Sequence, residues 1–155
     1  PVSPEDRLAA LGLDLPPPFA PPASFVPAVR TGSLVFLSGH GPTGSDGQPL
    51  VRGRLGEDLT VEDGYRAARL TALALLGSLK GEIGSLDRVA RVVKLLGMVR
   101  CTPDFGQQPA VINGASDLLI ELFGERGRHA RSAVGMHDLP FGIPVEIEMV
   151  VELRD

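Results

Sequence analysis

The amino-acid sequence predicts an α+β sandwich made of one mixed sheet with two helices on one of its faces. Two strand-like segments come first, and two amphipathic helical segments then flank a third, continuously apolar strand. Two more strand-like segments complete the order β-β-α-β-α-β-β. With 155 residues, of which 43% are hydrophobic, the chain is large enough for a single packed core and too apolar to be disordered.

The first two strands are expected over residues 25–30 and 33–38, on either side of a tight turn at Thr31-Gly32. The second of them contains Leu34–Leu37, which is apolar on both faces. The polar, glycine-rich segment 41–54 that follows predicts a long loop.

An N-terminal arm is expected ahead of these strands. Ser3 is suited to cap a short helix that ends near Gly12, and five prolines within residues 15–22 predict an extended surface segment. We therefore divide the chain into an arm, residues 1–22, and a domain, residues 23–155.

The two helices have clear start and stop signals. Residues 60–63 resemble a capping box and begin a helix that ends at Gly84, and the second helix is expected over Pro109–Phe123. Between them, residues 88–101 are too β-branched and too continuously apolar for a surface helix. This segment predicts a strand that is buried on both faces.

The last two strands are expected over residues 131–137 and 144–153, joined by the turn-rich segment 138–142. A simple antiparallel hairpin of these strands would place Arg131 near Val150.

The strand pattern also predicts assembly. Two helices can cover only one face of a sheet, yet residues 34–37 and 92–99 are apolar on both faces. The simplest cover for the second face is another copy of the chain, so we expect a homo-oligomer.

Composition narrows the functional classes. The one cysteine cannot form an intramolecular disulfide, so a cytoplasmic location is the default expectation. A net charge of −4 argues against a nucleic-acid binder that works mainly through phosphates. The longest apolar run, Leu70–Leu79, is about half the length of a membrane span, so no membrane association is expected.

Two side chains near the C-terminus could carry chemistry. Arg131 enters a strand whose remainder is small and apolar, and a guanidinium held there suits a carboxylate or phosphate ligand. A structural ion pair with an acid of the last strand explains it equally well. Glu146 and Glu148 share one face of that strand, and burial by assembly would leave one of them paired, solvated in a cleft or functional.

Other candidates are weak. The glycines of residues 39–44 have dinucleotide-binding spacing, but no helix opens after them. His40, His129 and His137 have no metal-ligand spacing and are interpreted as surface or loop histidines. Cys101, at the end of an apolar strand, is expected to be a buried, inert thiol.

Three segments together resemble the RidA/YjgF family. They are Val29–Gly39, then Ala130–Val134, and then Leu139-Pro140 followed by Val145–Glu148. Members of that family carry a P-A-R-S-x-V strand, an L-P pair and a V-E-I-E strand in this order and spacing. The resemblance covers about residues 23–153 and is closest to a divergent branch.

The resemblance implies a chorismate-mutase-like subunit in a homotrimer, with the sheets lining a central barrel and ligand clefts between neighbouring subunits. It further implies hydrolysis of reactive enamines and imines, such as 2-aminoacrylate, to 2-keto acids and ammonia, without metal or organic cofactor. The implied partners are a small 2-imino or 2-keto acid and two further copies of the chain.

The resemblance also assigns roles to residues. Arg131 stands at the family's carboxylate-binding arginine, and Glu146 at the acid that holds or activates the attacking water. The remaining positions implied to bind substrate are Phe25, Ser38, Gly39, Asn113 and Ala133.

Several positions depart from the family pattern. Phe25 replaces a tyrosine, His40 a common glutamine, His129 the proline before A-R-S, and Ala133 a frequent cysteine. The loop before Asn113 is also longer than usual. Two alternatives to a deaminase therefore stay open: a binding module for small carboxylates without turnover, and an endoribonuclease or translation inhibitor.

Overall fold

A computed structural model describes residues 2–154 and confirms the α+β class. The strands are β1 Ala28–Thr31, β2 Leu34–His40, β3 Val89–Arg100, β4 Ala130–Met136 and β5 Val145–Leu153. The α-helices are α1 Pro4–Ala10, α2 Val61–Ile83 and α3 Gln108–Phe123. The predicted order of elements is confirmed. The first strand begins at Ala28 instead of residue 25, because Pro27 has no N–H to contribute to the ladder.

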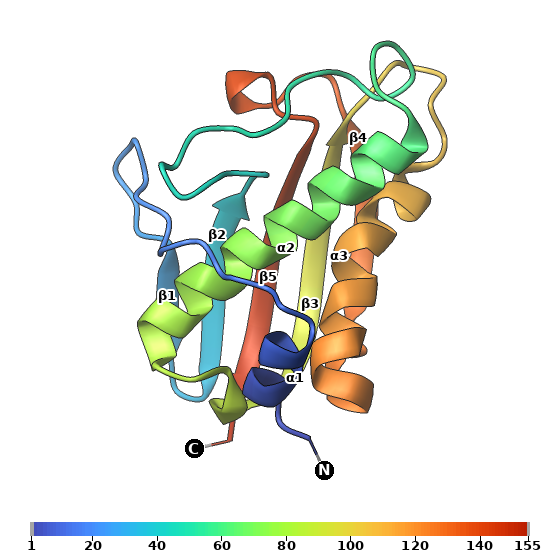
Figure 1. The fold of residues 1–155 in the computed structure, drawn as a ribbon. Coiled ribbons are helices and arrows are strands. Elements are labelled where there is room, and N and C mark those ends of the chain that lie inside the picture. The colour runs from blue at the N-terminus through green and yellow to red at the C-terminus, as the bar shows by residue number, and fades with distance from the viewer. Residues whose placement is uncertain (1, 155) are drawn as a thin grey trace.

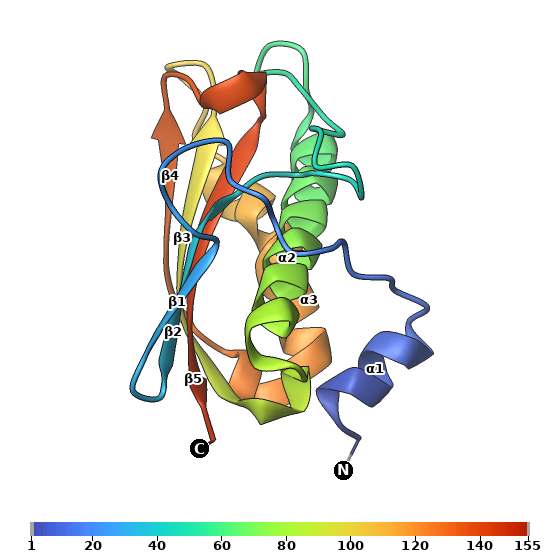
Figure 2. The same ribbon diagram turned by 90° about the vertical axis from the view of Figure 1, so that its left-hand side faces the viewer.

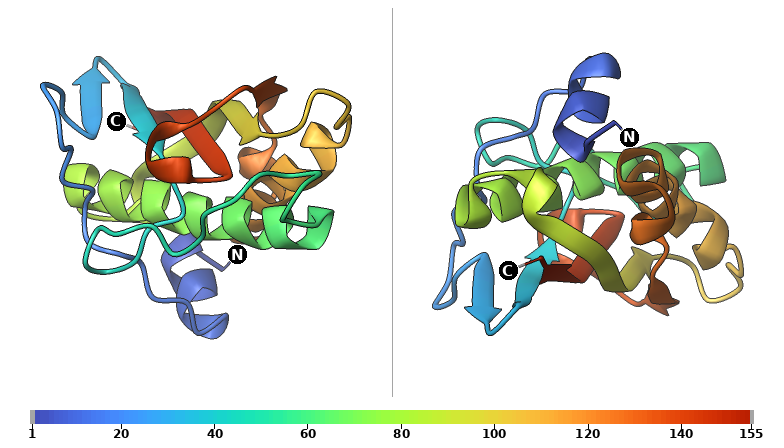
Figure 3. Two further views of the ribbon diagram at one scale, coloured as in Figure 1. Left: turned by 90° about the horizontal axis from the view of Figure 1, so that it is seen from above. Right: turned by 90° about the horizontal axis from the view of Figure 1, so that it is seen from below.

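Figure 2 shows the molecule edge-on as layers: the sheet, then α2 and α3 together, then α1 outermost. Both long helices lie on the same face of the sheet, which Figure 3 shows from above and below. The proline-rich arm crosses the outer side of α2 (Figure 1), where the Phe19 N–H donates to Ser78 Oγ at 2.9 Å. Within residues 2–154, no helix combines the length and apolar character needed to cross a membrane.

The sheet has the strand order β1-β2-β5-β3-β4, with β3 and β4 parallel and the other neighbours antiparallel. The expected hairpin of the last two strands is therefore wrong. The chain passes from β3 through α3 to β4, and such a crossover returns parallel to the strand it left. β5 takes the other side of β3, so Arg131 pairs with Leu95 and not with Val150.

The main core lies between the sheet and α2 and α3. Leu75 of α2, Leu95 of β3 and Ile147 of β5 are all fully buried in it. The capping box of α2 is formed: the Asp63 N–H donates to Thr60 Oγ1, and the Thr60 N–H donates to the Asp63 carboxylate. These contacts set where α2 begins over the sheet.

The opposite face of the sheet carries no α-helix in the described part of the chain (Figure 2); only the segment around the short 3-10 helix Pro140–Gly142 packs there, where Leu139 and Ile143 contact Met98. Val29 and Phe36 lie there with 53% and 45% of their surface exposed. Val134 of β4 is also exposed on this face. We call this face of the sheet, opposite α2 and α3, the open face. Its apolar character is the feature on which the predicted homo-oligomer rests.

Candidate active site

The predicted site residues fall into two groups that lie on different elements of the fold. The first, which we call the arginine half-site, lies on β4 and α3 and contains Asn113, Arg131 and Ala133. The second, which we call the glutamate half-site, lies on β2, β5 and the segment before β1 and contains Phe25, Ser38, Gly39 and Glu146.

Arg131 is anchored against α3. Arg131 pairs with Leu95 of β3, and paired residues of neighbouring strands point to the same face of a sheet. Because Leu95 points into the core, the Arg131 side chain extends from the edge strand β4 to the face that carries the helices. Its Nη1 donates to Asn113 Oδ1 at 2.9 Å and to Ser116 Oγ at 3.1 Å. Its Nη2 donates to the Pro109 carbonyl at 3.3 Å. Asn113 is therefore brought to the predicted arginine, although its spacing from Arg131 departs from the family pattern.

Three hydrogen bonds fix the Arg131 guanidinium in place. Its positive charge is not neutralised, because all three acceptors are neutral. Among residues 2–154, no carboxylate forms an ion pair with it, so the alternative of a structural ion pair with an acid of the last strand is not realised within one chain. A guanidinium has five N–H groups. The Nε–H and one Nη2–H have no acceptor in this part of the chain. These two groups can bind a carboxylate in bidentate fashion.

Glu146 faces the other way. Its neighbours Val145 and Ile147 point into the core, so its side chain extends to the open face, where it lies over Gly39. A Cβ atom at position 39 would overlap the Glu146 carboxylate. Burial, and to a smaller extent the charge of Glu148, raises the pKa of Glu146. A carboxyl group whose pKa is raised holds a proton more readily than a free one, which suits a group that both takes and returns a proton.

Ser38 and Phe25, the other two residues of the glutamate half-site, make different contacts. The Ser38 hydroxyl donates to the Val26 carbonyl at 2.7 Å, and the Ser38 N–H donates to the Pro27 carbonyl at 3.0 Å. Ser38 thus holds the segment before β1 against β2. Phe25 is 46% exposed and packs at an angle against Phe19 of the arm.

In a single chain the two half-sites do not meet. β3 separates β5 from β4, and Glu146 and Arg131 extend to opposite faces of the sheet. One copy of the chain therefore presents two separate groups of complementary chemistry: a cation with two unused donors, and a carboxyl group with a raised pKa.

The interpretation of the histidines as surface or loop residues is wrong for His40, which is only 2% exposed. Its Nδ1 donates to the Ser38 carbonyl at 2.6 Å, and its Nε2 accepts from Ser78 Oγ at 2.7 Å. Burial lowers the pKa of His40. The Phe19 ring covers its imidazole, with ring centroids 5.0 Å apart.

His129 is also integrated into the structure, because it contacts Gly127 and Ser116, whereas His137 is exposed as expected. His40 is the last residue of β2 and His129 directly precedes β4, so the sequence marks only His40 as the end of an apolar strand.

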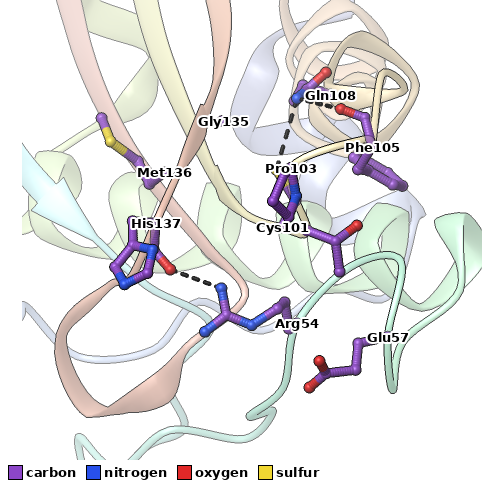
Figure 4. A pocket seen from close by; sticks show the side chains of 10 residues that line it. Arg54, Glu57, Cys101, Pro103, Phe105, Gln108, Gly135, Met136 and His137 are labelled. Carbon is purple, nitrogen blue, oxygen red and sulfur yellow. Dashed lines mark hydrogen bonds between the residues drawn. The ribbon is translucent and has the colours of Figure 1, made fainter.

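A pocket of about 490 Å³ lies at the carboxyl-terminal end of β4 (Figure 4). Gly135, Phe105 and Gln108 line it, and Arg54 and Glu57 border it from the loop before α2. None of these residues was singled out from the sequence, because a loop contributes to a pocket only through tertiary contacts.

Cys101 also lines this pocket and is buried, as expected; its Sγ accepts from Gln108 Nε2 at 3.6 Å. Within the described residues, no three His, Cys, Asp or Glu side chains gather as a metal site.

Comparison with known proteins decides the family. The sequence profile described as "YjgF/chorismate_mutase-like, putative endoribonuclease" matches residues 5–151. The chain belongs to this YjgF family. The fold, with its mixed five-stranded sheet and helices on one face, is the YjgF chorismate-mutase-like fold.

Several YjgF-family relatives match over nearly their whole length. Protein TCP17 of Trypanosoma cruzi is 45% identical over 150 residues, which are 96% of this chain and 93% of that protein. The crystal structure of Atu1372 from Agrobacterium tumefaciens is 44% identical, with a TM-score of 0.89 over 97% of this chain and 92% of that chain. A Shewanella oneidensis protein, described as a "putative endoribonuclease", is 36% identical, with a TM-score of 0.93 over 97% and 99% of the two chains.

RidA of a Psychrobacter species shares the fold at greater distance, with 23% identity, a TM-score of 0.63 and coverage of 88% and 94% of the two chains.

Proposed function

We propose that this YjgF-family protein hydrolyses small 2-imino acids and their enamine tautomers, such as 2-aminoacrylate, to 2-keto acids and ammonia. The observation that carries the proposal is the Arg131 guanidinium, which is fixed by three neutral acceptors and keeps its charge and two N–H groups for an anion. The matching of Arg131 and Glu146 to the positions of the family's arginine and acid supports the same conclusion.

Each group has a distinct role in the proposed reaction. Arg131 binds the substrate carboxylate and so places the imine carbon. Glu146, as a carboxylate, takes a proton from water while the water oxygen bonds to the carbon of the protonated imine, which gives a carbinolamine. The protonated acid returns this proton to the nitrogen, and the C–N bond then breaks while the carbinolamine hydroxyl loses its proton to Glu146 and becomes the keto oxygen. Glu146 passes that proton to the departing ammonia, which leaves as ammonium. The raised pKa of Glu146 suits a group that must hold the proton between the two steps.

We further propose a homotrimer in which the arginine half-site of one copy faces the glutamate half-site of the next. The separation of the half-sites within one chain supports this arrangement, since a second copy is needed to join them. The exposed apolar side chains of the open face support burial between copies.

The direct test is an assay of keto acid and ammonia while an amino-acid lyase generates 2-aminoacrylate in the same solution. We expect the protein to accelerate hydrolysis over the spontaneous rate, and Arg131→Ala to lose about 100-fold or more, since two charge-assisted hydrogen bonds are removed. Arg128→Ala is the matched control, because that arginine pairs with Glu125 at the surface. Hydrolysis at the spontaneous rate with wild-type protein, or unchanged hydrolysis with Arg131→Ala, contradicts the proposal.

A binding module without turnover is the second candidate. Phe25 favours it, because the phenylalanine lacks the hydroxyl of the family's tyrosine. Calorimetry that shows Arg131-dependent binding of pyruvate, together with hydrolysis at the spontaneous rate, would select this candidate.

Ribonuclease activity has less support from the structure. Arg126 donates to the Val89 carbonyl and Arg128 to Glu125, so the basic cluster near β4 is used within the chain.

Gly39 provides a test of the glutamate half-site that should leave folding intact. Gly39→Ala places a methyl group where the Glu146 carboxylate lies, and that flexible side chain can move aside. We expect deaminase activity to fall about 100-fold, as for a misplaced catalytic group, with little change in thermal stability. Gly106→Ala is the control, because a Cβ there meets nothing within 4 Å. Equal activities of the two variants would argue against a role for the Glu146 position.

A further inference from the structure

A chain of hydrogen bonds continues from Arg131 away from the expected ligand. Arg131 Nη1 lies 3.1 Å from Ser116 Oγ, and that oxygen lies 2.8 Å from Nε2 of His129. The other ring nitrogen, Nδ1, lies 2.6 Å from the Gly127 carbonyl oxygen. The four groups come from β4, α3 and the turn between them, so the chain of contacts is tertiary.

Donor chemistry assigns every proton in this chain. A carbonyl oxygen can only accept, so Nδ1 of His129 carries the hydrogen and Nε2 presents a lone pair. A guanidinium can only donate, so Ser116 Oγ accepts from Arg131. The Ser116 hydroxyl hydrogen then points to His129 Nε2, the one acceptor it contacts here. Burial, and to a smaller extent the charge of Arg131, lowers the pKa of His129, which keeps the ring neutral and this lone pair available.

We infer that His129 is a positioning residue for Arg131 and acts through the Ser116 hydroxyl. A helical serine without such an acceptor turns its hydrogen to the carbonyl of the preceding turn. By holding that hydrogen, His129 directs a Ser116 lone pair to Nη1 and fixes the guanidinium edge whose Nε–H and Nη2–H remain for the carboxylate. The inference rests on the proposed function for the identity of that carboxylate, but the positioning itself is a property of the ligand-free protein.

A second serine–histidine pair, Ser78 with His40, shows which contact is specific to Ser116 and His129. His40 also donates through Nδ1 to a carbonyl two residues earlier and accepts through Nε2 from a helical serine, Ser78. Ser78, however, accepts from the Phe19 backbone N–H and not from a guanidinium. The two serine–histidine pairs therefore share their chemistry and differ in what they orient: a segment of the arm in one case, and the proposed substrate-binding cation in the other.

Two replacements of the imidazole separate positioning from packing. His129→Gln keeps an acceptor near the position of Nε2, whereas His129→Leu keeps the bulk and removes the acceptor. We expect His129→Leu and Ser116→Ala to raise the Kd for pyruvate, and the KM for the imine, about 10-fold while kcat changes less, since one orienting hydrogen bond is lost. His129→Gln should restore values near those of the wild type. Ser78→Ala is the matched control and should leave both constants unchanged.

A measurement without substrate keeps the inference separate from the proposed function. Nitrogen-15 NMR of the Arg131 side chain reports rotation about the Nε–Cζ bond, and we expect this rotation to be slow in wild type, His129→Gln and Ser78→Ala and faster in His129→Leu and Ser116→Ala. Equal rotation in all five proteins overturns the inference. If rotation changes as expected but Arg131→Ala binds pyruvate as the wild type does, the positioning stands and the proposed function fails.

Discussion

Assembling Arg131→Ala and Glu146→Gln subunits together is expected to restore about a quarter of the proposed deaminase activity, which each variant should lack alone. The reason is the position of the two side chains on opposite faces of the sheet in one chain. In a proposed cleft, one subunit supplies Arg131 and its neighbour supplies Glu146. Random mixing at equal amounts leaves both residues intact in about one cleft in four.

A second mixing experiment distinguishes a cleft shared between subunits from a site within one subunit. When the double variant, Arg131→Ala with Glu146→Gln, is mixed with wild-type chains, a shared cleft again predicts about a quarter of full activity, whereas a site within one chain predicts about a half. The two single variants would then restore nothing. Co-refolding from denaturant ensures exchange, and sedimentation reports the mass of the assembly. A result of about a half together with no restoration would place both residues in one subunit and contradict the intersubunit cleft.

Gly114→Ala is expected to destabilise the fold strongly, against the intrinsic preference of helices for alanine. Gly114 lies where α3 crosses α2, and a Cβ there would overlap the Tyr65 carbonyl and crowd Ala68. Helix propensity alone would stabilise the protein by about 1 kcal/mol. Because the obstructing atoms are backbone, the helices must separate, and we expect a net loss of about 3 kcal/mol. For a domain of this size, that loss lowers Tm by about 10 °C.

The size and sign of that change can be checked by thermal and urea unfolding. Gly106→Ala serves as the reference, because it adds the same methyl group in open space. Since α3 also carries Asn113 and Ser116, a displaced α3 should weaken pyruvate binding as well. A Gly114→Ala protein as stable as the reference would show that the helices can part at little cost.

The candidate site was proposed from the sequence as a set of residues, and its geometry came only from the structure. Arg131 and Glu146 lie in short motifs that can be recognised from a single sequence. The faces to which they point follow from the pairing of β4 with β3 and from the burial of Val145 and Ile147, which depend on contacts distant in sequence. His129 carries no motif at all, because its role arises only where α3 brings Ser116 to the start of β4.

The sequence by itself determined the class of each element and most of its limits, because caps, glycine stops and apolar periodicity act within a few residues of one another. The Thr60 capping box and the alternation along β5 are examples that the structure confirms. Only the tertiary structure decided that β3 lies between β4 and β5, that the two half-sites lie on opposite faces, and that a histidine supports the arginine. Strand order and helix placement are those that bury the most apolar surface of the whole chain. This burial depends on contacts between residues distant in sequence, so no short segment of the sequence predicts it.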